Sequence, residues 1–361
     1  MLSDLIHVLL RFRICFRKPI FFLVCVLLLS LFDSWTLFTH AQKPDVKSKV
    51  GKVTMSGYTQ VQFQATNRDA AESRTTFEVR RGRLQLEAEL KKNMSLRIEF
   101  DATTTGVRGR DLYLRYDIGR SLTLKAGQLK KPFSYGRLRA ARRLRIIERP
   151  THIREDFRGY LGRDVGLLAE WDPIKPVEFS IGVFNGSGVG PGARIDNDDA
   201  KDVVGRIEYE PFKDLIFGLN ASSHSTVQTI HNPLPVLAEE RFTAYGADVS
   251  CDIGNLKLIA EGLYADKPQI DSDAEIIGLY VTGVYKREVK AYGLVAMEHG
   301  GRLEYKDENG SIDIMDSLIS ITPYVGFFFH SKARIQFNPV LRFPQAGGAI
   351  LEFITQAQIE F

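Results

Sequence analysis

Apolar and polar residues alternate one by one along most of the chain after residue 52. Residues 94–102 read Met-Ser-Leu-Arg-Ile-Glu-Phe-Asp-Ala, and residues 333–337 read Ala-Arg-Ile-Gln-Phe. Successive side chains of a β-strand point to opposite faces, so this period of two predicts strands with one apolar face and one polar, often charged, face. No comparably long segment with the 3.6-residue period of a helix follows residue 41.

Sixteen such segments are predicted, joined by connections that alternate between short and long. They span residues 53–67, 75–91, 93–103, 109–118, 121–130, 164–172, 176–186, 202–210, 214–222, 241–252, 255–265, 275–286, 289–298, 318–329, 332–343 and 349–361. An even number of antiparallel strands with this alternation is typical of a transmembrane β-barrel of the bacterial outer membrane. A soluble barrel or sandwich shows the same alternation of faces, but the number of strands and the charge on their polar face favour the membrane barrel.

The first forty-one residues have the layout of a secretory signal peptide. Basic residues at 11–18 precede an apolar run of about 14 residues, 19–32, and a polar stretch ends at Ala41. A membrane anchor is the alternative, but a spanning helix needs about 20 apolar residues. We therefore expect cleavage after residue 41, a short periplasmic segment at 42–52, a barrel domain at 53–361, and a protein located in the outer membrane.

The positive charge of the chain is concentrated in one predicted connection. The formal net charge is only +4, too small to indicate nucleic acid as a partner. The longest connection, 131–163, carries ten basic residues, nine of them arginines, against three acidic ones, a net charge of +7. We expect this third extracellular loop to fold towards the lumen, where rings of arginine and lysine favour anions and phosphate. Guanidinium groups remain charged and match the oxygens of phosphate.

Several sequence stretches resemble the phosphate-selective porin O and P family. They are Phe-Glu-Val-Arg-Arg-Gly-Arg-Leu-Gln-Leu at 77–86, Asp-Leu-Tyr-Leu-Arg-Tyr at 111–116 and Leu-Lys-Ala-Gly-Gln-Leu-Lys-Lys-Pro-Phe at 124–133. Ile-Glu-Arg at 147–149, Arg-Asp-Val-Gly-Leu at 163–167 and Gly-Val-Phe-Asn-Gly-Ser-Gly at 182–188 follow in the same order. The resemblance covers most of residues 53–361. It implies a homotrimeric, sixteen-stranded channel with a path for phosphate-like anions lined by arginine and lysine.

The candidate anion-binding and pore-lining residues come from this loop and from the strands beside it. Alternation places Arg83, Lys125 and Arg81 on the lumen face, and Arg80 beside Arg81 breaks the alternation, which predicts a β-bulge or a strand end there. The full set is Arg81, Arg83, Lys125, Lys131, Arg137, Arg139, Arg142, Arg143, Arg145 and Arg149. Two other interpretations remain open: loop arginines that bind wall carboxylates structurally, and surface arginines that bind lipopolysaccharide phosphates.

No recognisable catalytic or metal motif is present, so we expect no enzyme and no cofactor. Ser223 and His224 fall in a predicted outer loop, which keeps an outer-membrane hydrolase or surface-binding barrel as a third hypothesis. The first hypothesis is a passive anion channel, and the second is a general, weakly selective pore with structural arginines. Replacing Arg142, Arg143 and Arg145 with Ala separates the first two: the first predicts a loss of anion preference, and the second a loss of stability.

Overall fold

The computed structural model describes residues 46–48, 51–67, 75–154, 157, 161–189, 200–231, 235–269, 272–309, 317–345 and 347–361. The predicted signal peptide lies outside these residues. Seventeen strands are present, β1 (Val46–Ser48), β2 (Gly51–Thr66), β3 (Thr75–Lys91), β4 (Met94–Thr103), β5 (Gly106–Ile118), β6 (Leu122–Lys130), β7 (Arg163–Ile174), β8 (Val177–Phe184), β9 (Asp202–Phe212), β10 (Leu215–His231), β11 (Pro235–Ile253), β12 (Leu256–Gln269), β13 (Ser272–Ala291), β14 (Leu294–Asn309), β15 (Leu318–His330), β16 (Ala333–Pro344) and β17 (Ile350–Glu360).

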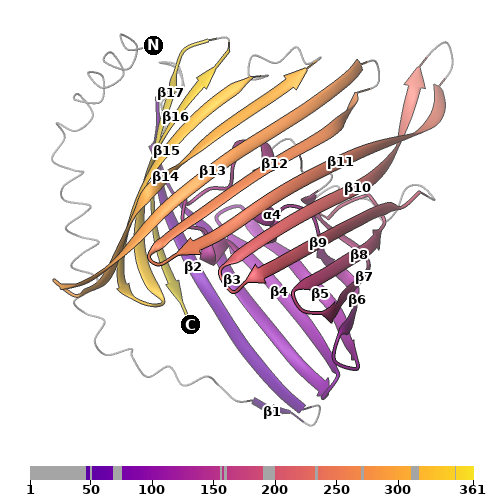
Figure 1. Cartoon of the computed structure of the whole chain (residues 1–361), viewed down its shortest axis with the longest axis horizontal. Helices are drawn as coiled ribbons and strands as arrows, with labels where there is room; N and C mark the ends of the chain where they lie inside the picture. The colour runs from indigo at the N-terminus through magenta and orange to yellow at the C-terminus, as the bar shows by residue number, and fades with distance from the viewer. Residues whose placement is uncertain are drawn as a thin grey trace.

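Strands β2 to β17 form one closed antiparallel barrel, which confirms the predicted sixteen-stranded fold (Figure 1). Each strand pairs with the next along the chain, and β17 pairs with β2 to close the ring, Gln358 lying opposite Gln60. Across this closure Gln60 donates to Gln358 at 2.6 Å and Gln62 donates to Gln356 at 2.7 Å. The short β1 adds a hairpin to the start of β2.

Some strands are longer than the alternation predicted. Residues 223–231, 235–240, 266–269, 272–274 and 299–309 were expected in long connections but continue strands β10 to β14. The connection expected at 104–108 shrinks to two residues, because β5 begins at Gly106. The alternation of apolar and polar residues marks only the part of a strand whose outer face must be apolar. The backbone hydrogen bonds between neighbouring strands continue beyond that part, so these strands are longer than the alternation indicates.

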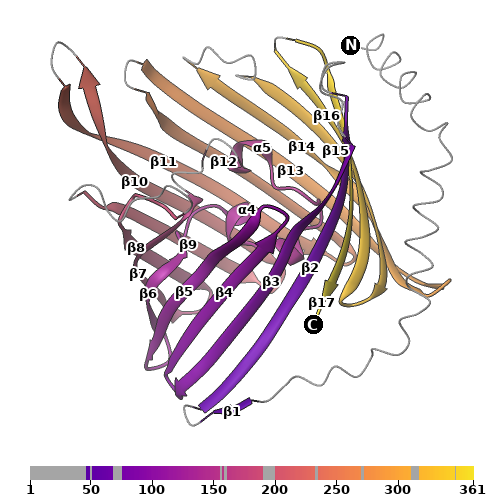
Figure 2. The same cartoon turned by 180° about the vertical axis from the view of Figure 1, so that it is seen from behind.

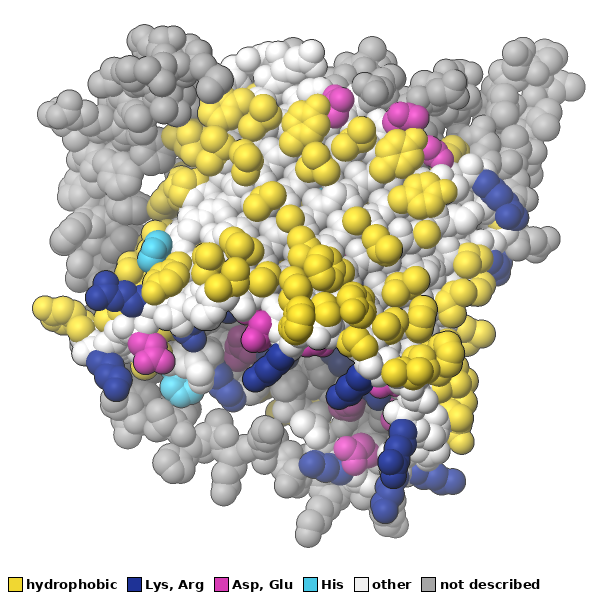
Figure 3. All heavy atoms as spheres, in the orientation of Figure 1, with side chains coloured by type: hydrophobic (Ala, Val, Ile, Leu, Met, Phe, Trp, Pro, Cys, Tyr) yellow, Lys and Arg dark blue, Asp and Glu magenta, His cyan; other side chains and the backbone are white. Residues whose placement is uncertain are grey.

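The outer face is apolar and the inner face is polar. On β5, Leu112, Leu114 and Tyr116 are each at least 43% exposed, whereas inward-facing glutamines such as Gln62 and Gln356 are buried. Figure 3 shows apolar side chains spread across one outer face, with most charged side chains towards its margins. None of the helices in the described part of the chain is long and apolar enough to cross a membrane.

Two β-bulges turn additional charged residues inward. The pairing of β2 with β3 shifts so that Gln60 faces Arg81 and Val61 faces Val79, which leaves Arg80 as the extra residue. Of the two alternatives predicted at Arg80, a bulge or a strand end, the structure shows the bulge, because β3 continues on both sides of Arg80. A second shift between β4 and β5, after Ile98, places Arg110 and Asp111 together opposite Glu99. A bulge breaks strict alternation, so neighbouring residues such as Arg80 and Arg81 reach the same side.

The segment between β6 and β7, described at residues 131–154, 157 and 161–162, lies inside the barrel. It contains α4 (Tyr135–Leu138), the 3-10 helix η2 (Ala141–Arg143) and α5 (Thr151–Arg154), and Figure 2 shows α4 and α5 within the ring of strands. Its Phe133, Ile153, Phe157 and Leu161 are fully buried against apolar wall residues such as Leu263. The apolar core of the molecule is thus the contact between this inward segment and the wall.

Candidate functional site

The inward segment is fixed to one side of the barrel by hydrogen bonds to buried wall carboxylates. The backbone amide of Gly136 donates to Glu261 on β12 at 2.9 Å, and that of Thr151 donates to Glu304 on β14 at 2.7 Å. Further along, the amide of Ile147 donates to Asn338 on β16 at 2.9 Å. These contacts hold the backbone of the segment against β12, β14 and β16.

The space left on the opposite side is a cavity of about 640 Å³ with a strongly basic lining. Strands β3 to β7 and β10, the inward segment and the residues after β8 enclose it. Ten of its lining residues are basic and two are acidic, a formal net charge of +8. The basic residues are Arg80, Arg81, Arg83, Arg108, Arg110, Lys130, Arg137, Arg149, Arg154 and Arg163; the acids are Asp101 and Glu148.

Part of this charge is balanced by carboxylates. Arg83 pairs with Asp101 at 2.7 Å and with Glu99 at 3.3 Å. Arg163 pairs with Asp111 at 2.5 Å and reaches Glu99 at 3.4 Å. These pairs are buried, so they hold β3, β4, β5 and β7 together at the base of the cavity while neutralising the two arginines.

Three other cations in the lining, Arg81, Lys130 and Arg149, have no carboxylate within ion-pair distance among the described residues. Arg149 donates to the carbonyl oxygens of Gly136 and Arg139 at 2.9 and 2.7 Å, and Lys130 likewise donates to two carbonyls of the segment. Arg81 donates to the side chain of Gln60 at 2.9 Å. Burial, and after it the charges of Arg137 and Arg81, lowers the pKa of Arg149 well below its usual value. The positive potential of the cavity is therefore not cancelled from within.

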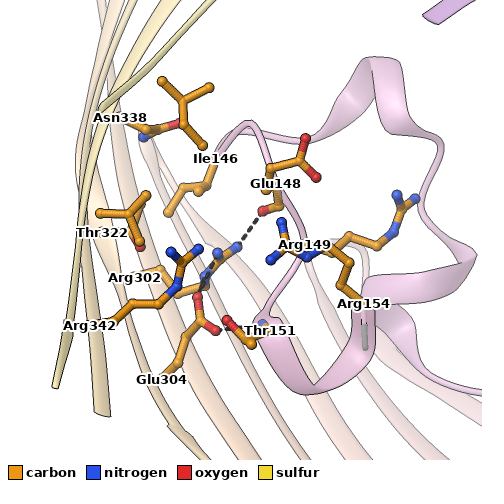
Figure 4. Close-up of a pocket in the computed structure, with 12 residues that line it drawn as sticks. Ile146, Glu148, Arg149, Thr151, Arg154, Arg302, Glu304, Thr322, Asn338 and Arg342 are labelled. Atoms are coloured by element: carbon orange, nitrogen blue, oxygen red, sulfur yellow. Dashed lines mark hydrogen bonds and ion pairs between the residues drawn. The ribbon is translucent and has the colours of Figure 1, made fainter. Parts of the chain in front are cut away.

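Glu148 lies between the large cavity and a smaller pocket on the other side of the segment. Its carboxylate accepts from Arg80 at 2.9 and 3.2 Å and from Gln62 at 3.4 Å. Its backbone oxygen accepts from Arg302 on β14 at 2.7 Å, and Figure 4 shows the carboxylate pointing away from that guanidinium. Burial alone would raise the pKa of Glu148, but the nearby charges of Arg80 and Arg81 outweigh it and lower the pKa to about 2.

Of the residues predicted from the sequence, the structure brings four together in the cavity: Arg81, Arg83, Arg137 and Arg149. Six others lie outside its lining: Lys125, Lys131, Arg139, Arg142, Arg143 and Arg145.

Most of those six are engaged elsewhere. Lys125 pairs with Glu170 at 2.5 Å, and Lys131 is buried against Asp202 and Asp164. The Arg139 guanidinium lies over the ring of Tyr135. Arg142 pairs with Glu360 at 2.9 Å, and Arg145 pairs with Glu298. Arg143 is exposed, and within the described part of the chain its side chain makes no ion pair.

The sequence prediction did not select six of the ten basic residues that line the cavity: Arg80, Arg108, Arg110, Lys130, Arg154 and Arg163. Arg110 reaches the lumen through the β5 bulge, and Arg108 was placed in a loop. Lys130 is next to Lys131 on the strand end, and alternation alone does not decide which of the two faces the cavity. A search for broken alternation, as at Arg80, is the signal that would have found Arg110.

The Ser223 and His224 pair expected in an outer loop lies in strand β10, on opposite faces. His224 is buried on the inner face, with Nδ1 2.7 Å from Asp202, whereas Ser223 occupies the alternate position. The two side chains therefore cannot act together. Within the described ranges, no three His, Cys, Asp or Glu side chains are grouped so as to hold a metal ion.

Comparisons with known proteins agree with this architecture. A family described as "Phosphate-selective porin O and P" matches residues 53–230. The anion-selective porin from Comamonas acidovorans superposes with a TM-score of 0.65 at 13% identity, covering 86% of this chain and 99% of that one. The outer membrane channel DcaP of Acinetobacter baumannii gives 0.62 at 12% identity, with 88% and 99% covered. A trimer form of OmpT of Vibrio cholerae gives 0.56 at 13%, with 86% and 99% covered. A search of the curated proteins found no match.

Proposed function

We propose that this chain, an outer-membrane porin of the phosphate-selective porin O and P family by its match over residues 53–230, conducts small anions passively through the basic cavity. The observation that supports the proposal is the net charge of +8 on a lining in which Arg81, Lys130 and Arg149 have no carboxylate partner among the described residues. A barrel wall that excludes lipid and a lumen potential of one sign are the parts that a selective pore needs. Family and fold point to a channel rather than an enzyme.

The donors in the cavity suit phosphate-like oxyanions. Guanidinium groups offer pairs of parallel N–H donors that match two oxygens of one anion. A cavity of about 640 Å³ also has room for water around such an anion, so the site need not strip the hydration shell completely. Concentrated positive charge then raises the local concentration of anions and excludes cations. We therefore name phosphate and other small oxyanions as the substrate class.

A general, weakly selective pore is the second candidate, and it is favoured by two particular ion pairs. Arg142 and Arg145 bind Glu360 and Glu298 on the wall, which is the arrangement expected of structural arginines. Their charge is neutralised where they lie. We therefore assign the selectivity to the cavity residues and assign anchoring of the segment to Arg142 and Arg145.

Three further features complete the proposal. The signal peptide at 1–41 would direct export, and the longer connections, together with the inward segment, would enter from the extracellular side. Lipopolysaccharide and outer-membrane lipid would surround the apolar outer face. We also propose a homotrimer, an assembly for which the OmpT structure of Vibrio cholerae provides a similar barrel in trimer form.

The experiment is a reversal-potential measurement in a planar bilayer under a potassium chloride gradient, repeated with inorganic phosphate added. An anion channel gives a reversal potential near that of chloride, and phosphate at modest concentration blocks the chloride current. A reversal potential near zero with no block would instead identify the general pore. Folded protein without any current would reject both.

A further inference from the structure

Glu148 places a carboxylate among the cations of an otherwise basic cavity. Both of its oxygens bind the guanidinium of Arg80, and Gln62 donates to one of them. Only 8% of the residue is exposed, and the low pKa keeps the carboxylate ionised at every pH at which a bilayer is used. A carboxylate held by a guanidinium fork makes the same contacts that a permeating oxyanion would make.

We propose that Glu148 is a tethered competitor for permeating anions and thereby sets the phosphate affinity of the pore. The inference rests on the proposed anion conduction and assigns to Glu148 a specificity-determining role in it. Because the carboxylate is attached to the segment, its effective concentration beside Arg80 is high and does not depend on the concentration of diffusing anions. A passing anion therefore binds the remaining cations and does not gain the full strength of the Arg80 fork.

Wall residues hold the backbone of Glu148 on the side of the segment that faces away from the proposed anion path. Arg302 on β14 donates to its backbone oxygen at 2.7 Å, and the neighbouring Ile147 amide is bonded to Asn338. The backbone is thus held by the wall, and the carboxylate is directed at the β3 bulge. A carboxylate needed only to anchor the segment would duplicate contacts that the backbone already makes.

The functional gain is the speed of release. Without Glu148 the lining would carry a net charge of +9 and would bind a doubly charged oxyanion tightly and release it slowly, whereas conduction requires binding that is weak enough to let the ion leave. Glu148 lowers the net charge to +8 and occupies the guanidinium fork of Arg80. It therefore exchanges affinity for throughput beside Arg80.

The test compares E148Q with the wild-type protein and with E298Q in planar bilayers. Glu298 is a matched control, because it is a buried carboxylate that binds an arginine of the same segment, Arg145, but does not line the cavity. Inorganic phosphate is titrated against the chloride current. We expect E148Q to lower the half-blocking phosphate concentration about tenfold, since one full charge is removed at contact distance, and to slow recovery from block. E298Q is expected to match the wild type.

A graded variant covers the case in which E148Q fails to fold. E148D keeps the charge but withdraws it from Arg80 by one methylene, so its phosphate block should lie between those of the wild type and E148Q. Equal or weaker phosphate block in a well-folded E148Q, or in E148D where only that variant folds, overturns the inference. So does an equal tightening in E298Q.

Failure of the proposed function is recognised separately. A wild-type pore without anion preference rejects the proposed anion selectivity. The reversal potential in potassium chloride still tests the competitor role of Glu148. In that case E148Q must shift the potential towards that of chloride, and E298Q must not. An absence of that difference rejects the competitor role as well.

Discussion

Replacing Arg149 with Met should weaken the selectivity of the pore without weakening its fold. The Arg149 guanidinium lines the basic cavity and donates only to carbonyl oxygens, those of Gly136 and Arg139. Its charge is therefore available to a permeating anion. Methionine has a comparable length and leaves the segment packed while removing the charge.

The magnitude follows from the location of the charge. Two unit charges 4 Å apart interact by about 1 kcal/mol in water and by about 4 kcal/mol at the effective dielectric of a protein surface. A cavity of about 640 Å³ has room for water around an anion, so we take a loss of about 1–2 kcal/mol, between these two limits, for a singly charged anion. This corresponds to a half-blocking phosphate concentration that rises by roughly five- to thirtyfold.

The effect on stability has two opposed parts. Two hydrogen bonds from a charged donor contribute about 1.5–3 kcal/mol each. A buried guanidinium without a carboxylate costs several kcal/mol in lost hydration, and the lowered pKa of Arg149 reports that cost. Because the two contributions are similar in size, we expect the thermal unfolding midpoint of R149M to lie close to that of the wild type.

The matched control is R139M, since the Arg139 guanidinium lies over the ring of Tyr135 at 5.2 Å and does not line the cavity. Phosphate block and reversal potential are measured for both variants, together with thermal unfolding followed by circular dichroism. R149M with unchanged phosphate block would refute the assignment of its charge to the anion path. A large loss of stability with normal block would show that Arg149 is structural.

Three other changes test the segment that forms the cavity. His152 is fully buried and has no hydrogen-bond partner among the described residues, and burial lowers its pKa to about 4 from 6.5. Acidification from pH 6.5 to 4 should therefore lower the free energy of unfolding by up to about 3 kcal/mol. This loss should be absent in His152→Leu when unfolding is followed against pH. A Cβ on Gly278 would overlap the His152 ring, so Gly278→Ala should cost about 1–3 kcal/mol in thermal stability, and an unchanged midpoint would contradict this packing. Arg142→Ala with Arg145→Ala should lower heat stability with little change in reversal potential, while Arg143→Ala, which removes an exposed lumen charge, should reduce anion preference slightly.

The barrel could be predicted from the sequence because the bilayer imposes a simple rule. Each strand must present apolar residues to lipid at every second position, so all sixteen strands were found, although the bounds of β10 to β14 differ from the predicted ones by up to eleven residues. The rule says nothing beyond the apolar zone, and so β10 and β11 are longer than expected. The inner face obeys no comparable rule, since it only has to be polar.

The proposed anion site was only partly predictable, because it depends on which wall residue each arginine meets. Arg142 and Arg149 are seven positions apart in one basic segment, and nothing in the local sequence distinguishes them. Arg142 meets Glu360, which is 218 residues away along the chain, and becomes neutralised. Arg149 donates to two carbonyl oxygens, which do not neutralise its positive charge.

In the proposed function, the division of these arginines into paired and unpaired ones is the feature that would turn a basic loop into a selective site. A segment whose cations were all paired would be a stable plug with no net potential, and one whose cations were all unpaired would repel itself from the lumen. Here the wall of β12 to β17 supplies the carboxylates that hold the segment, whereas the β3 and β5 bulges add further cations on the open side. The stability of the segment and the potential of the pore therefore come from opposite sides of the same barrel, which is why the two properties can be altered separately by mutation.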